Sequence, residues 1–187
     1  IKVDRARLGV LETATVILAL GRFHKNKAFD VLIRSLVDVR GAVLWLAGDG
    51  PLWVALRALA RELGVADRVR FLGWRDDVAD LIASADILVC PSRHEPLGNV
   101  VIEAWAQGKP VVAASSDGPL HLIRDGETGI LVPVDAPAAL AAALSRVSGD
   151  SELAGRLGAA GEVEYRARFT EEKIVCDYRD FFRRIAG

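Results

Sequence analysis

The sequence predicts an α/β domain of three layers, helices on both faces of a parallel sheet of about six strands. Short apolar runs alternate with longer segments of helical periodicity from one end of the chain to the other. Most of these runs are apolar on both faces, which is typical of parallel strands that helices cover on both sides. A length of 187 residues, 51% of them hydrophobic, suits one domain with a full core better than two.

Strands are expected at residues 16–20, 43–47, 69–72, 87–89, 111–113 and 130–132. Helices are expected at residues 29–39, 52–63, 78–83, 100–107, 136–147, 151–168 and 170–185. Pro51 stands at an expected first helical position, and Gly64 follows a helix where a left-handed cap is easiest for glycine. Thr170 is the expected N-cap of the last helix. That helix carries an aromatic stripe of Tyr178, Phe181 and Phe182, for which we expect core packing or an interdomain contact.

Composition narrows the classes of partner. The chain has 24 basic and 25 acidic side chains and a pI near 6.4, so its overall charge does not favour nucleic acid or an anionic membrane surface. No apolar run reaches the length of a membrane span. Cys90 and Cys176 are expected to be free thiols, Cys90 as a small buried hydrophobe. Because the chain starts at Ile1 and contains no methionine, we expect it to be a piece of a longer protein.

Two loops after predicted strands carry the polar side chains that suggest chemistry. In parallel α/β sheets, ligands bind beyond the carboxyl ends of the strands. The loop after the first strand, residues 21–27, begins with a glycine and holds three cations and a histidine. The loop after the fourth strand, residues 91–99, contains Glu95 and leads directly into a helix. These two loops are therefore the expected ligand site.

The helix that follows has an unusual composition. From residue 100 to residue 106, Glu103 is the one residue that is not apolar. Asn99, Glu103 and Gln107 form a narrow polar stripe, which should face a polar cleft because a buried unpaired carboxylate is costly. The helix start, with Gly98 beside it, offers free N–H groups to a phosphate. Glu103 lies about 7 Å further along the axis, where a ribose would fall.

The segment from Glu95 to Glu103 resembles the E-x7-E motif of retaining glycosyltransferases with the GT-B fold, the group often called family 4 or group 1. Similar matches to the family's motifs extend across nearly the whole chain. Residues 21–27 resemble G-R-x4-K, residues 47–51 A-G-x-G-P, residues 69–73 the R-V-x-F-x-G strand, and residues 125–132 D-G-x-T-G-x-L-V. The resemblance implies a Rossmann-like three-layer α/β/α domain, one half of a GT-B fold. It further implies that residues 1–187 are the C-terminal nucleotide-sugar-binding domain, with a crossover helix at 170–186 that returns to an absent N-terminal acceptor domain.

The resemblance also implies roles. Arg22, Lys27 and Glu95 would be catalytic: the two cations would neutralise the donor diphosphate, and Glu95 would hydrogen-bond the transferred sugar. Glu103 would hold the ribose and Trp74 would lie against the base. The implied donor-binding residues are Gly21, Trp74, Leu97, Gly98, Asn99, Val100 and Glu103.

No cofactor is expected besides the nucleoside-diphosphate sugar itself. The sequence has no Asp-x-Asp triplet, so metal-independent transfer is expected. The expected location is the cytoplasm, or the membrane periphery through the absent domain. The chain departs from the family at Ala28, where glycine is usual and helix formation should tolerate alanine, and at His121, where a carboxylate is usual.

Other functions remain open. A non-catalytic nucleotide-binding or protein-interaction domain of the same fold is the main alternative, and a sugar epimerase would need further acid and base groups. A dinucleotide-dependent oxidoreductase would need G-x-G-x-x-G after the first strand, where this chain has Gly21-Arg22-Phe23-His24. For Arg93 and His94, a surface ion pair and a functional role are equally open. His24 and Lys25 are expected to face solvent. The base, the sugar and the acceptor are not specified by the sequence.

Overall fold

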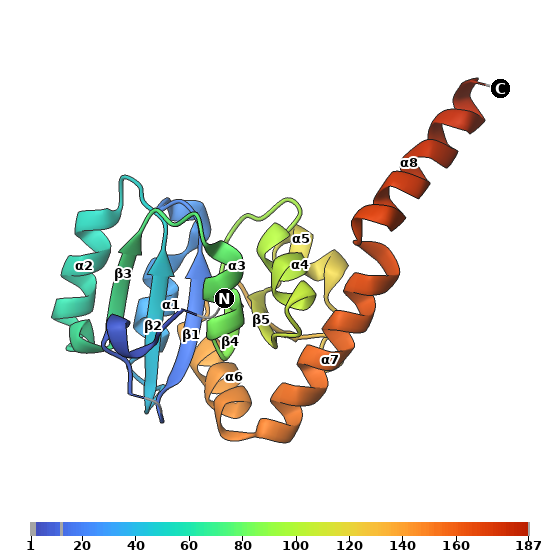
Figure 1. The fold of residues 1–187 in the computed structure, drawn as a ribbon. Coiled ribbons are helices and arrows are strands. Elements are labelled where there is room, and N and C mark those ends of the chain that lie inside the picture. Colours follow the sequence, from blue (N-terminus) through green and yellow to red (C-terminus); the bar gives the residue numbers. More distant parts are fainter. Residues whose placement is uncertain (1–2, 12, 187) are drawn as a thin grey trace.

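The structure is a computed structural model that describes residues 3–11 and 13–186. Its strands are β1 (Thr15–Leu20), β2 (Ala42–Ala47), β3 (Val69–Gly73), β4 (Ile87–Cys90), β5 (Val111–Ala114) and β6 (Ile130–Val132). Over the described residues they form one parallel sheet in the order β3-β2-β1-β4-β5-β6 (Figure 1). The predicted parallel sheet of about six strands is confirmed.

A helix follows each of these strands, two more helices end the described chain, and three short 3-10 turns complete the described elements. The helices are α1 (Phe29–Ser35), α2 (Trp53–Glu62), α3 (Val78–Ser84), α4 (Asn99–Ala106), α5 (Asp117–Leu122), α6 (Pro137–Gly149), α7 (Ser151–Arg168) and α8 (Glu171–Ala186). The 3-10 turns are η1 (Ala6–Leu8), η2 (Lys25–Lys27) and η3 (Ala66–Arg68).

Three features of the helices differ from the prediction. Helix α1 ends at Ser35 rather than at residue 39, and Pro51 lies in the turn before α2 rather than in its first position. Helix α5 was not predicted because its six residues include Gly118 and Pro119, and so short a segment carries no usable periodicity. Gly64 does follow α2 with a left-handed φ of 69°, as predicted for a C-terminal cap.

The sheet divides the core into two apolar layers. Along β1, Ile17 and Ala19 point into the layer that α1, α2 and α6 cover. Val16 and Leu18 point into the opposite layer, under α3, α4 and α5. Successive side chains of a strand point to opposite faces, so a run that is apolar throughout serves both layers. Cys90 belongs to the second layer and is 2% exposed, in agreement with its predicted role.

The strand order places a crevice between β1 and β4. The chain leaves β1 for β2 and β3 on one side, then crosses to β4 on the other side of β1. The loops that follow β1 and β4 therefore diverge at the carboxyl edge of the sheet, where parallel α/β folds bind ligands. These are the two loops that the sequence predicts to carry the chemistry.

Helix α4 is held from behind by α7. A Cβ added at Gly161 of α7 would lie 2.2 Å from Trp105 Cδ1 of α4, so the close approach of the two helices requires glycine. The Trp105 indole N–H donates to the carbonyl oxygen of Thr128 at 2.9 Å. The helix that carries Glu103 is thus fixed by contacts on the side away from the crevice.

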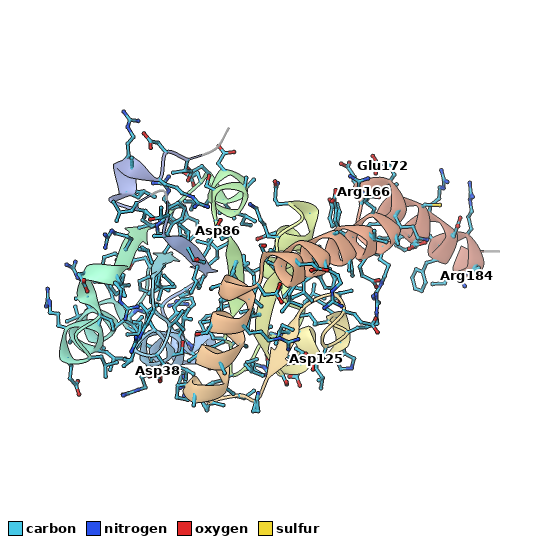
Figure 2. All side chains as sticks on the ribbon, turned by 90° about the horizontal axis from the view of Figure 1, so that it is seen from below. Asp38, Asp86, Asp125, Arg166, Glu172 and Arg184 are labelled. Atoms are coloured by element: carbon cyan, nitrogen blue, oxygen red, sulfur yellow. The ribbon has the colours of Figure 1, made fainter. Side chains whose placement is uncertain are left out.

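Helix α8 projects away from the three layers (Figure 1). Figure 2 shows Glu172 and Arg184 on this helix, away from the sheet. Tyr178, Phe181 and Phe182 are exposed and contact one another, so the aromatic stripe does not enter either described core layer. Of the two predictions for this stripe, core packing within this domain is wrong.

Candidate functional site

Glycines form the floor of the site, where the ends of the first three strands meet. Gly21 N donates to the carbonyl oxygen of Ala47 at 3.0 Å, and Gly48 N to that of Gly73 at 2.7 Å. A Cβ added at Gly48 would lie 2.0 Å from the carbonyl oxygen of Gly21. Only glycine at position 48 therefore allows the turn after β2 to pack closely against the loop after β1. With no side chain at this position, space remains beside the carboxyl end of β1.

A cavity of about 300 Å³ opens above this floor. Its lining includes six of the predicted site residues: Gly21, Arg22, Lys27, Trp74, Val100 and Glu103. Leu20, Ala47, Gly48, Arg75 and Val78 complete it. Side chains from the loops after β1 and β3 and from α4 thus meet at one place, as the sequence predicts.

Glu103 lies beside apolar side chains at the edge of this cavity. Over the described residues its carboxylate makes no hydrogen bond or ion pair, and Val78 and Val100 line the cavity beside it. Desolvation raises the pKa of Glu103 above its usual range. The Arg22 side chain, which lines the same cavity, likewise has no hydrogen bond or ion pair within the described chain. The cavity therefore presents an unpaired acceptor and an unpaired cation to any molecule that enters it.

Lys27 and Glu95 form an ion pair across the crevice. Lys27 Nζ donates to Glu95 Oε2, to which Ser92 Oγ also donates at 3.2 Å. The two charged side chains are 25% and 12% exposed, so this pair is well shielded from solvent. Ser92 is a contact that the sequence analysis missed. A hydroxyl three residues before a site carboxylate is the signal that could have identified it.

A second cavity, of about 330 Å³, adjoins the first. Arg22 and Lys27 line both cavities, whereas His24, Asn26, His94, Glu95 and Pro96 line only the second of the two. Glu95 and Glu103 therefore lie in adjacent chambers with the two cations between them. An elongated ligand with an anionic centre would fit this order of groups.

Leu97, Gly98 and Asn99 do not line either of these two cavities in the described structure. Gly98 is the N-cap of α4, with a left-handed φ of 87°, and is buried against Leu122. Asn99 and Leu97 are exposed. Val100 directly follows Asn99, and of the predicted donor-binding residues from 97 to 100 it is the one that lines the first cavity.

The loop that holds Glu95 rests on the start of α5. Gly118 N donates to the carbonyl oxygen of Glu95 at 2.7 Å, and a Cβ at Gly118 would lie 2.4 Å from the backbone of Leu97. This close backbone contact gives the segment around Gly118 a supporting role. His121 is exposed and its Nδ1 lies 2.7 Å from the carbonyl oxygen of Asp117 in its own helix.

The loop after β3 contributes Trp74 and Arg75 to the lining of the first cavity. Trp74 is 79% exposed and donates from its indole nitrogen to Asp76 at 3.0 Å. Arg75 makes a two-pronged contact with Asp77, at 2.7 and 2.5 Å. Hydrogen bonds from Arg75 lower the pKa of Asp77. Trp74 thus presents a large apolar face at the edge of the cavity. The ion pair between Arg75 and Asp77 lies in the same loop.

Several neighbouring residues have structural partners. Ala28 lies outside any helix, as the N-cap of α1 with a φ of 51°, so the prediction that it sits in helical backbone is wrong. This left-handed backbone explains why glycine suits the position. Arg93 pairs with Asp30 and Asp135, and His94 Nδ1 lies 3.5 Å from Asp117. His24 is partly buried and accepts from Asn26 N at 3.4 Å, which corrects the expectation that it simply faces solvent.

Among the residues that the structure describes, no group of three or more His, Cys, Asp or Glu side chains is placed to hold a metal ion. Over the same residues, none of the helices is both long and apolar enough to span a membrane.

A family model described as glycosyl transferases group 1 matches residues 14–150. The chain therefore belongs to the group 1 glycosyltransferases. It is 42% identical over 178 residues to the lipopolysaccharide core biosynthesis glycosyltransferase LpsE of Rhizobium meliloti (strain 1021). That match covers 95% of this chain and 52% of the relative.

Solved structures agree with this assignment to the group 1 glycosyltransferases. HepE of Anabaena, determined in complex with UDP and glucose, matches with a TM-score of 0.91 at 28% identity, over 95% of this chain and 50% of that one. Sucrose-phosphate synthase of Thermosynechococcus elongatus matches with a TM-score of 0.87 at 32% identity, over 97% and 48%. The predicted Rossmann-like, GT-B type of fold is confirmed, and the chain spans about half the length of the curated relatives it matches.

Proposed function

We propose that this group 1 domain binds the nucleoside-diphosphate sugar of a retaining glycosyltransferase across its two adjoining cavities. The observation that carries the proposal is the position of Lys27 and Arg22 between Glu103 in one chamber and Glu95 in the other. A donor has the same order of chemical groups: a nucleoside, an anionic diphosphate and a sugar. Retention of anomeric configuration rests on the resemblance of the segment 95–103 to the E-x7-E motif.

Each end of the donor has a chemically suitable partner. Glu103, which has no partner among the residues that the structure describes, can accept two hydrogen bonds from the vicinal hydroxyls of a ribose. Trp74 can place its exposed ring against the base. Lys27 and Ser92 hold the Glu95 carboxylate in place, so that it can accept hydrogen bonds from the transferred sugar. The N–H group of Val100, the residue at the start of α4 that lines the first cavity, can bind a phosphate oxygen.

Arg22 and Lys27 supply the chemistry of bond cleavage. As the glycosidic bond breaks, negative charge grows on the leaving diphosphate, and two fixed cations stabilise it. The same two charges make a divalent metal unnecessary at this position. We therefore expect EDTA to leave donor binding unchanged.

Uridine is the first base to test, because HepE is known in complex with UDP and with UDP-glucose. Titration with nucleotide sugars identifies the sugar, whereas the acceptor is expected to bind the rest of the protein. We infer that residues 1–187 form the C-terminal half, that α8 packs against the N-terminal half, and that this half carries the acceptor. On this proposal the chain alone binds donor but transfers no sugar, and the whole enzyme works in the cytoplasm or at the membrane periphery.

Isothermal titration of the chain with UDP, GDP, ADP and their sugars tests the proposal. We expect one nucleoside diphosphate to bind, and Lys27→Ala to weaken it at least about tenfold, as for the loss of a charged hydrogen bond. Lys25→Ala, an exposed lysine of the same loop, is the matched control and should have no effect. Absence of binding to every nucleotide would favour a non-catalytic protein-interaction domain, and robust transfer by the chain alone would refute the division of labour between the halves.

A further inference from the structure

Arg93 ties the two loops of the site together, and the proposed function gives it no role. Its guanidinium donates from Nη1 and Nη2 to the two carboxylate oxygens of Asp30, at 2.9 and 2.7 Å. Nη1 also donates to the carbonyl oxygen of Lys25 at 2.7 Å, and Nε lies 2.5 Å from Asp135 Oδ1. One side chain after β4 therefore contacts the loop after β1, helix α1 and the loop after β6.

Backbone contacts reinforce this junction directly beside the catalytic pair. The N–H groups of Arg93 and His94 both donate to the carbonyl oxygen of Asn26, at 2.8 and 3.3 Å. Asn26 is the residue before Lys27, and His94 is the residue before Glu95. The loops are therefore attached to each other one residue away from each member of the Lys27–Glu95 ion pair.

Strained backbone lies at one residue that Arg93 contacts, Asp135, and at Ala28, between two of its partners, Lys25 and Asp30. Within the described residues, the non-glycine residues with positive φ are Ala28, at 51°, and Asp135, at 56°. A left-handed backbone is unfavourable for residues that carry a Cβ, so surrounding contacts must maintain it. Ala28 follows Lys27, and Arg93 binds residues on both sides of that turn. Asp135 is itself a partner of Arg93.

We propose that Arg93 is a positioning residue for donor binding, which holds Lys27 and Glu95 in register for the diphosphate and the transferred sugar. This inference rests on the proposed function. The Arg93 donors point at Asp30, Asp135 and Lys25, so its effect on a ligand passes through the residues that it holds. A lysine would not replace it, because only the planar guanidinium can bind Asp30 with two parallel bonds and still reach Asp135.

Comparison of UDP with UMP tests the proposal, or of GDP with GMP if titration selects guanosine. Arg93→Ala should weaken binding of the diphosphate about tenfold, since small displacements of positioned groups are costly, and Arg93→Lys nearly as much. Monophosphate binding, which depends on Glu103 and Trp74, should stay within about twofold. Equal weakening of diphosphate and monophosphate would overturn the proposal.

Arg5→Ala provides a matched control. Arg5 donates to the carbonyl oxygen of Ser84 and to Asp86, and its side chain is 27% exposed, compared with 30% for Arg93. Its contacts lie at the opposite end of β4, so Arg5→Ala should leave both affinities unchanged. In a Lys27→Ala background, Arg93→Ala should have little further effect on diphosphate binding, because a positioning residue acts through its target. Fully additive losses would contradict that role.

Hydrogen exchange gives a readout that needs no ligand. Arg93→Ala should accelerate exchange of the amides at residues 92–95 and 26–28, whereas Arg5→Ala should not. If the wild-type chain binds no nucleotide, the proposed function fails, and the exchange rates still decide whether Arg93 fixes these loops. Unchanged exchange there would overturn the proposal independently.

Discussion

Glu103 is a carboxylate whose position weakens the fold in the absence of a ligand. It has no partner in the described chain, and desolvation raises its pKa. A carboxyl group with a raised folded-state pKa stabilises the fold while it is protonated. That contribution is lost as the pH rises from the ordinary glutamate pKa through the folded-state pKa. Once ionised, the group therefore opposes folding, a conflict that hydrogen bonds from a bound ribose would relieve.

Glu103→Gln tests this conflict. We expect the variant to melt at a higher temperature than the wild type at pH 7, with the difference shrinking as the pH falls toward about 4.3, the ordinary glutamate value. Binding of the nucleoside diphosphate should weaken at least about tenfold, because a charged hydrogen bond is lost. Thermal melts across this pH range, with titration at pH 7, measure both effects. Loss of stability at pH 7 would show that Glu103 has a structural partner.

The ion pair between Lys27 and Glu95 should be coupled in stability. Lys27→Met leaves the shielded Glu95 carboxylate with Ser92 alone, and should lower the free energy of unfolding by about 1–3 kcal/mol. Adding Glu95→Gln removes the uncompensated charge and should recover part of that loss. Chemical denaturation of the two single variants and the double variant forms the cycle. Additive losses would mean that the two side chains do not interact in solution.

The helices and strands were predicted more fully than their junctions. Short runs such as residues 16–20 identify their strands because a strand of a parallel sheet is buried on both faces and is therefore apolar at every position. The six-residue helix α5 and the left-handed turn at Ala28 depend on packing between distant segments, which local periodicity does not contain. Glu103 was identified as the one carboxylate in an apolar helix, and Glu95 from its loop after the fourth strand together with the resemblance of the segment to the E-x7-E motif. Ser92 and the anchoring role of Arg93 depend on which residues the fold brings opposite them.

Helix α7 offers two glycines that should respond in opposite ways to the same change. A Cβ at Gly161 would lie 2.2 Å from Trp105, whereas Gly155 has open space around it. Gly161→Ala should cost about 1–3 kcal/mol of unfolding free energy by forcing α7 away from α4. Gly155→Ala should stabilise the chain by about 0.5–1 kcal/mol, because alanine favours a helix over glycine. Denaturant titrations measure both, and similar effects of the two substitutions would contradict the described helix contact.

Helix α8 should contribute little to the stability of this domain. Its apolar side chains, including Ile174, Tyr178, Phe181, Phe182 and Ile185, are exposed. Truncation after Thr170 should therefore leave the melting temperature and the affinity for nucleotide nearly unchanged, and should reduce self-association because an exposed apolar stripe is removed. Calorimetry and size-exclusion chromatography check these outcomes. A fall of several degrees would mean that α8 packs on this domain.

At the scale of the whole molecule, the positive charge available to a ligand is concentrated at one site, while the net charge of the chain is close to zero. The chain is nearly neutral, with 24 basic and 25 acidic side chains, yet Arg22 and Lys27 both lie at the crevice between the loops that follow β1 and β4. The strand order creates that crevice. Glycines at the strand ends leave space in it because they carry no side chain, and Glu103 of α4 lines it. A neutral domain can thus recognise a doubly anionic group without a general affinity for anions.

A crystal structure of the chain with the nucleoside-diphosphate sugar that it binds best tests the central claim most directly. We predict the ribose hydroxyls at Glu103, the diphosphate within hydrogen-bond distance of Lys27 Nζ and the Arg22 guanidinium, and the sugar beside Glu95. A ligand bound elsewhere, or in this crevice with its phosphates away from both cations, would contradict the account.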